Sequence, residues 1–175
     1  MQDRFGIPVA SLLAALIPFF SGVLGAVAAN IPISFFGGIV PPPLLALMPV
    51  YFWCLVRPDL MPPSAAFAVG LAEDLLSGGP PGVWALSFLF CYAIVDRQRD
   101  TFAGLAGYGA VLGFASIMLV ACGVSYVTVS VLNSRLVPME MLVLEIGIST
   151  LFYIPVLWLM TGIQHRVIGP LRSDF

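Results

Sequence analysis

Four acidic residues stand in or beside apolar stretches of the chain, and their positions need a chemical explanation. Glu73 and Asp74 are adjacent near the end of one apolar segment, whereas Glu140 and Glu145 lie near the start of the last one. A charged side chain in an apolar environment is costly unless it meets a partner or water. The pattern therefore predicts a polar cavity or a partner group beside these carboxylates.

The sequence contains few residues that could form a catalytic site together with these acids. His165, the only histidine, lies at the far end of the last apolar segment, away from the acids. Glu73 and Asp74 would point about 100° apart on a helix, a poor arrangement for sharing a proton. No phosphate-binding glycine loop, metal-ligand pair or Ser/His/Asp set is present in the sequence. We expect a non-enzymatic protein with no metal or other cofactor.

Three cysteines, far apart in apolar segments, are interpreted as packing residues: Cys54, Cys91 and Cys122.

The composition indicates which elements must hold these residues. Hydrophobic residues make up 60% of the 175-residue chain, charged residues make up 9%, and the mean hydropathy is +1.04. From Phe5 to Val56 no charged side chain occurs, a run long enough for two membrane-spanning helices of about 20 residues each. This run is too long for a signal peptide, although Ala26-Val27-Ala28 resembles a cleavage site, so removal of the first helix stays open. All seven basic residues are arginines and the net charge is −2, which argues against binding to nucleic acid.

Long apolar runs without strict alternation predict helices, because a bilayer requires each backbone polar group to be satisfied within its own segment. We predict one all-α domain over residues 1–175, a compact bundle of about six transmembrane helices in the lipid bilayer. The spans are expected near Pro8–Ala29, Ile39–Val56, Leu60–Leu76, Gly82–Val95, Phe102–Ser130 and Pro138–Gln164.

The arginines orient this bundle. If the N-terminus is cytoplasmic, Arg135 is the only external arginine, and six are cytoplasmic: Arg4, Arg57, Arg97, Arg99, Arg166 and Arg172. Positive charge gathers on the cytoplasmic side of membrane proteins, so the distribution favours six spans with both termini inside. Merging the third and fourth spans into one re-entrant hairpin leaves every later loop on the same side, and this alternative stays open.

The third and fourth segments are short for membrane spans. They are joined by a loop that contains Gly78, Gly79, Pro80, Pro81 and Gly82. The 33 residues from Pro63 to Val95 give two legs of about 25 Å each, against a hydrocarbon thickness of about 30 Å. The tip of this hairpin is therefore expected below the outer surface. Glu73 and Asp74 then face a water-filled funnel or a polar group of a neighbouring helix; the alternative is that they are simply hydrated at the interface.

In the last segment, Pro138 suits the first helical position and places Glu140 in the first turn, where the helix dipole favours an acid. Glu145 lies about 7.5 Å deeper and needs a partner or a cavity. Arg135 is the external cation that the chain offers to these acids. Small residues recur every four positions in two other segments and predict close helix packing: Ser21, Gly25 and Ala29, and Gly109 and Gly113.

The stretch from Pro42 to Leu89 resembles the rod shape-determining protein MreD, a bacterial inner-membrane family of about this length. A proline opens a Leu-rich segment, Pro43-Leu44-Leu45, with aromatic residues in its second half. A proline-containing turn then leads to Gly70-Leu71, Asp74-Leu75-Leu76-Ser77-Gly78 and Gly82. This segment resembles the most recognisable part of the family. The chain departs from the pattern at Val40, where members tend to carry an arginine, and at the additional acid Glu73.

The resemblance implies a non-enzymatic component of the cell-elongation machinery. Such a protein would bind an MreC-like membrane protein and support the elongation-specific transpeptidase and glycosyltransferase of peptidoglycan synthesis, guided indirectly by actin-like MreB filaments. Glu73, Asp74 and Glu145 would then meet cations or donors of a partner. The alternative is a solute-binding membrane protein resembling the S components of energy-coupling-factor transporters. The expected external loops, 30–38 and 77–81, hold few polar groups to bind a soluble vitamin, which favours the scaffold.

Overall fold

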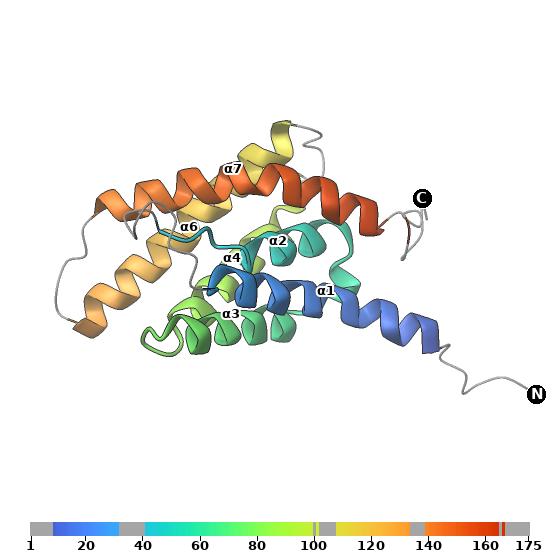
Figure 1. The fold of residues 1–175 in the computed structure, drawn as a ribbon, viewed down its shortest axis with the longest axis horizontal. Coiled ribbons are helices and arrows are strands. Elements are labelled where there is room, and N and C mark those ends of the chain that lie inside the picture. The colour runs from blue at the N-terminus through green and yellow to red at the C-terminus, as the bar shows by residue number, and fades with distance from the viewer. Residues whose placement is uncertain are drawn as a thin grey trace, which may run out of the picture.

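A computed structural model of the protein describes residues 9–31, 41–99, 101, 108–133, 139–164 and 166, and the regular secondary structure within them is helical. The prediction of an all-α chain is therefore confirmed for this part of the chain. It contains six α-helices and one 3-10 helix (Figure 1), which are α1 (Val9–Ala29), α2 (Leu47–Val56), η2 (Pro58–Leu60), α3 (Pro63–Ser77), α4 (Val83–Arg97), α6 (Tyr108–Asn133) and α7 (Met139–Ile163).

The short helix α2 is the centre of the bundle. Its residues are apolar on every side, which is the pattern of a helix surrounded by others. Every residue from Leu47 to Cys54 is buried, and α1, α4 and α7 all pack against the helix. Figure 1 shows α2 between α1 below and α7 above. Trp53 donates from its indole Nε1 to Ser21 Oγ over 3.1 Å, which joins α2 to α1.

Two predicted helix starts need correction. The second helix begins at Leu47, and the described residues 41–46 precede it, because Pro42 and Pro43 hold the residues before them out of the helical region; the predicted start near Ile39 lies outside the described residues. The third begins at Pro63 and not near Leu60 for the same reason. Pro62 is extended, with φ −68° and ψ 160°, and Pro63 takes the first helical position. Prolines therefore shorten both helices at their N-terminal ends.

The segment before α2 runs between α1 and α7. Its backbone groups lack helical partners, so one of them finds a side chain instead: the Leu44 N–H donates to Ser149 Oγ of α7 over 3.0 Å. On the other side, α1 approaches so closely that a Cβ at Gly25 would lie 2.7 Å from the Leu45 carbonyl oxygen. This non-helical segment is therefore a structural link between α1 and α7.

We expect Ser149→Ala to lower the free energy of unfolding by about 1–3 kcal/mol, because the buried Leu44 N–H would lose its acceptor. The thermal midpoint of the detergent-solubilised protein measures this loss. Ser116→Ala is the matched control, since Ser116 is exposed and its hydroxyl bonds only to the Leu112 carbonyl of its own helix. That control should change stability by no more than about 0.5 kcal/mol. Equal losses in the two variants would contradict the assigned role of Ser149.

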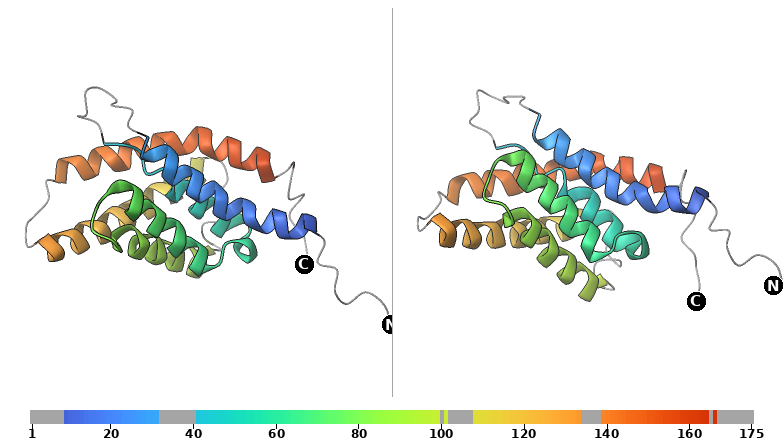
Figure 2. Two further views of the ribbon diagram at one scale, coloured as in Figure 1. Left: turned by 60° about the horizontal axis from the view of Figure 1, so that its bottom comes forward. Right: turned by 90° about the horizontal axis from the view of Figure 1, so that it is seen from below.

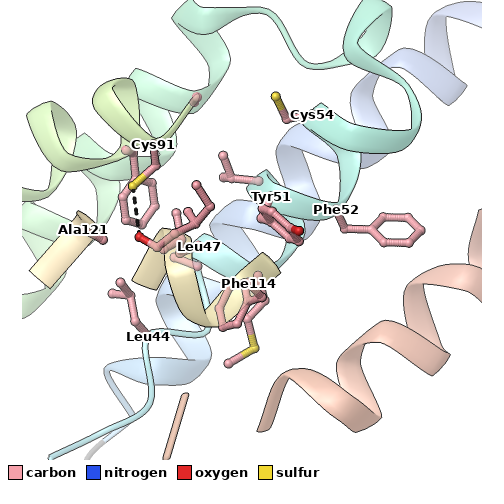
Figure 3. Packing of buried hydrophobic residues seen from close by; sticks show 14 of the residues in the cluster. Leu44, Leu47, Tyr51, Phe52, Cys54, Cys91, Phe114 and Ala121 are labelled. Atoms are coloured by element: carbon pink, nitrogen blue, oxygen red, sulfur yellow. Dashed lines mark hydrogen bonds between the residues drawn. The ribbon is translucent and has the colours of Figure 1, made fainter. Parts of the chain in front are cut away.

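Aromatic rings join α2 to the two long helices. Phe114 of α6 stacks on Tyr153 of α7 with ring centroids 4.2 Å apart, and Tyr51 of α2 meets both rings edge-on at 5.6 and 5.7 Å. Figure 3 shows Tyr51 and Phe114 in the buried cluster.

The three cysteines are free and buried: Cys54, Cys91 and Cys122. The Cys91 thiol donates a hydrogen bond to the Ile117 carbonyl oxygen over 3.6 Å, as Figure 3 also shows.

The helices differ in length. α6 and α7 have 26 and 25 residues, which correspond to about 39 and 37 Å at a rise of about 1.5 Å per residue. α3 and α4 have 15 residues each, about 22 Å, and pack side by side as a hairpin (Figure 2). Within the long pair, Gly109–Leu132 and Met141–Ile163 are long and apolar enough to cross a membrane. α7 also leaves large apolar side chains exposed, among them Val143 (69%), Leu151 (65%) and Trp158 (78%).

At the end of the bundle opposite to the hairpin loop, a surface ion pair fixes the turn between α2 and α3. Arg57 donates from Nε and Nη2 to the two carboxylate oxygens of Asp59 over 3.0 and 2.9 Å. These hydrogen bonds hold the pKa of Asp59 below its usual value. Because both side chains contact solvent, the pair contributes little to stability.

Candidate functional site

Asp74 closes the α3–α4 hairpin. Its Oδ2 accepts hydrogen bonds from the Gly82 and Ala85 backbone N–H groups over 2.9 and 3.1 Å, and its Oδ1 accepts one from Trp84 over 2.8 Å. The side chain is 2% exposed. Three backbone donors that would otherwise be unsatisfied at the start of α4 are therefore paired with one carboxylate.

The negative charge of Asp74 is stabilised by the dipole of α4, although it is disfavoured by the dipole of its own helix, α3. An acid near the C-terminus of α3 faces the negative end of that helix dipole, whereas the N-terminus of α4 presents the positive end. The hairpin brings the carboxylate to that positive end. Gly78, with φ +68°, ends α3 in the left-handed conformation, and Gly82, with φ +98°, precedes α4. Asp74 is thus the N-terminal cap of the next helix.

Close contact between α3 and α4 makes this geometry possible. A Cβ built on Gly70 would lie 2.7 Å from both the Ala85 Cα and the Trp84 carbonyl oxygen. Gly70 is one helical turn before Asp74, so both residues lie on the face of α3 that meets α4. A larger residue at position 70 would move the α4 N-terminus away from the carboxylate.

Glu73 points to a different neighbour. Its Oε1 accepts a hydrogen bond from Asn30 Nδ2 at the end of α1 over 2.9 Å, and Asn30 also donates to the Ala26 carbonyl oxygen. Glu73 is only 4% exposed, and its second oxygen, Oε2, is buried without a hydrogen-bond partner. Its carboxyl group is therefore half satisfied, in contrast to that of Asp74.

The other predicted acids lie on α7. Glu145 is half-buried and lies one turn before Ser149 on α7. Glu140 is in the first turn of α7, as expected for an acid at a helix start, but its side chain is outside the described part of the structure. Arg135 and His165 are outside the described residues as well. Among the described residues, the hydrogen bonds of Glu73 and Asp74 therefore lead to α1 and α4, and none joins either acid to Glu145.

The small residues selected from the sequence lie at helix contacts. On α1, Ala29 is buried, Gly25 meets the segment before α2, and Ser21 accepts the Trp53 hydrogen bond while donating to the Pro18 carbonyl oxygen. On α6, which packs against α4 and α7, Gly113 is buried and Gly109 is half-buried.

Sequence reasoning did not select Gly70 and Asn30, which the site uses, or Ser149, which accepts the Leu44 hydrogen bond elsewhere in the bundle. Gly70 could have been found from its spacing, four positions before Asp74 on one helix face. Asn30 is the only side-chain amide in the uncharged run from Phe5 to Val56, and a polar group in such a run needs a partner. For Ser149 no sequence signal exists, because its partner is a backbone group exposed by prolines far away in the chain.

The described contacts of this site are helix-capping and helix-packing contacts. Within the described residues, no group of three or more His, Cys, Asp or Glu side chains is placed to hold a metal ion. Asp74 and Glu73 diverge to opposite neighbours, so they do not share a proton. The geometry provides helix capping and a buried, partly satisfied acid. Comparisons with known proteins returned no matching family model, no matching curated protein and no matching solved structure.

Proposed function

We propose that the chain is a multi-pass protein of the bacterial inner membrane, with about six helices in the bilayer and both termini in the cytoplasm. The apolar surface supports this proposal, because large hydrophobic side chains cover the outside of α6 and α7 where a soluble protein would carry polar ones. Only 11% of the most apolar stretch of α7 is buried within the chain. Lipid is the environment that satisfies such a helix.

We further propose that the protein is a non-enzymatic scaffold of the cell-elongation machinery, of the MreD type. One observation carries this proposal: in the segment that resembles the family, the aspartate and the three glycines of the pattern each have a geometric role. Gly70 permits the contact with α4, Asp74 caps α4, and Gly78 and Gly82 take positive φ values. The pattern therefore specifies a short, rigid helical hairpin. This is a structural role and not a catalytic one.

As a scaffold, the protein would hold an MreC-like membrane protein, and through it the elongation-specific transpeptidase and glycosyltransferase. Its connection to MreB filaments would be indirect. The alternative of a solute-binding S component receives little support from the cavity whose lining lies within the described residues. The cavity of about 540 Å³ that α4 and α6 form is an open apolar groove, lined by Phe90, Val120, Gly123, Val124, Val127 and Thr128. Such a lining offers a water-soluble vitamin almost no hydrogen bonds.

Depletion of the protein from its own bacterium tests the scaffold role. We expect rod-shaped cells to become round within a few generations, and the full-length chain, supplied in trans, to restore the ratio of cell length to width. The MreC-like protein should co-purify with the tagged chain from detergent extracts. Cells that keep their shape, together with tight binding of a small solute to the purified chain, would favour the transporter reading instead.

A further inference from the structure

Glu73 is a buried acid whose two carboxyl oxygens are treated differently by the fold. Asn30 Nδ2 donates to Oε1 over 2.9 Å, whereas Oε2 is covered and has no hydrogen-bond partner in the described part of the chain. The side chain is 4% exposed. An ionised carboxylate in such a place needs donors on both oxygens or a cation beside it. A protonated carboxyl group keeps the Asn30 hydrogen bond on its carbonyl oxygen and buries no charge.

The helices that pack against α3, α1 and α4, bring no cation to Glu73. The sequence of α1 from Val9 to Ala29 contains no titratable side chain. Those of α4 lie beyond its first two turns: Cys91, Tyr92, Asp96 and Arg97. Arg97 is twelve residues after Ala85, which corresponds to about 18 Å along the helix. Glu145, the acid on α7 whose side chain is described, is also negative when ionised. The described surroundings therefore favour an uncharged Glu73.

Asp74 decides which of the two adjacent acids carries the proton. Its two oxygens accept three backbone N–H groups, so a proton on either oxygen would displace a donor at the start of α4. A proton on Glu73 displaces none and removes the repulsion between neighbouring carboxylates. Carboxyl groups with such different surroundings divide into one that stays charged and one that stays neutral.

We propose that Asn30 and Glu73 form a proton-dependent latch between α1 and α3. With its proton, Glu73 holds the end of α1; without it, the carboxylate turns toward water and releases that end. Asn30 transmits the change, because its backbone N–H and its side chain both bond to the Ala26 carbonyl oxygen in the last turn of α1. Two turns earlier, a Cβ on Gly22 would lie 2.9 Å from Val69 Cγ2, so the helices stay packed there. Only the last turns of α1 move.

The test compares the full-length chain with Glu73→Gln in lipid nanodiscs between pH 5 and pH 9. Glutamine accepts the Asn30 hydrogen bond and imitates the protonated acid at every pH. Unfolding releases the proton near neutral pH, since an exposed glutamate is ionised there, so stability of the wild type should fall as the pH rises. We expect equal thermal midpoints at pH 5 and a wild-type midpoint lower by about 3 °C or more at pH 9. Asp96→Asn, an exposed acid-to-amide change on α4, is the matched control and should follow the wild type.

Hydrogen exchange of residues 22–31 measures the latch itself. At pH 9 these amides should exchange faster in the wild type than in Glu73→Gln at the same pH, and in Asn30→Ala they should exchange fast at both ends of the pH range. Infrared difference spectra at pH 6 should show a protonated carboxyl band in the wild type that Glu73→Gln lacks. A missing band, or a Glu73→Gln midpoint below that of the wild type throughout, would show that Glu73 is ionised in the folded chain. Equal exchange in the wild type and Glu73→Gln at pH 9 would overturn the latch.

Discussion

Replacing Asp74 with alanine is expected to lower the free energy of unfolding by about 3 kcal/mol or more, the largest effect of any single side chain in the hairpin. The substitution leaves three N–H groups at the start of α4 without acceptors, and each buried unsatisfied donor costs about 1–3 kcal/mol. It also removes a negative charge from the positive end of the α4 dipole. Denaturant titration in mixed micelles measures the loss, and limited proteolysis should cut at the loop of residues 78–82 first.

Two control variants distinguish the loss of the Asp74 carboxylate from other effects of mutation near the end of α3. Asp74→Asn keeps one carboxamide oxygen as an acceptor, so its loss should be intermediate between those of the wild type and Asp74→Ala. Ser77→Ala removes only an exposed hydroxyl that donates to the Asp74 carbonyl oxygen, and it should be nearly neutral. If Asp74→Ala were as stable as Ser77→Ala, the carboxylate would not be capping α4 in the folded protein.

Gly70→Ala is the second change with a large expected effect, a loss of about 1–3 kcal/mol or more. The new Cβ would lie 2.7 Å from atoms of the Trp84–Ala85 backbone, which cannot rotate away as a side chain can. The helices must separate, and the hydrogen bonds that Asp74 accepts from the backbone N–H groups at the start of α4 lengthen with them. Combined with Asp74→Ala, the two losses should therefore be less than additive, because both act on the same contact.

Gly123→Ala is the matched control, since this glycine is also helical but a Cβ there would meet no atom within 4 Å. Alanine is the better helix former, so the control should be neutral or gain up to about 1 kcal/mol. The same measurement on both variants distinguishes a contact effect from a helix-propensity effect. A stabilised Gly70→Ala variant would show that α3 and α4 are not in the close contact described here.

These expectations assign the hairpin a mechanical role. α3 and α4 are held by a glycine contact along their faces and by Asp74 at their tip, so they act as one unit beside the longer helices α6 and α7. In the proposed bilayer setting, legs of about 22 Å would stop short of a hydrocarbon layer of about 30 Å. The outer ends of the long helices then remain available to partners in the membrane, which suits a scaffold.

Several features of the fold could be predicted from the sequence because they depend on local physics. Long apolar runs without alternation predicted helices, and glycines and prolines between residues 78 and 82 marked the break after α3. One predicted helix boundary was wrong, because the effect of neighbouring prolines on the backbone was not taken into account. Three consecutive prolines were treated as part of a helix that starts only at Leu47.

The sequence by itself determined that the chain is helical, where its glycines and prolines interrupt the helices, and that the acids near positions 73 and 145 need partners. Only the tertiary structure decided which partners Glu73 and Asp74 have. From the sequence, Asp74 is an acid at the unfavourable end of α3; in the fold it is the cap at the favourable end of α4, and Glu73, one residue earlier, turns to Asn30 on α1. The reason is physical: a side chain's cost in an apolar environment depends on its own type, whereas its hydrogen-bond partner depends on which distant segment packs against it.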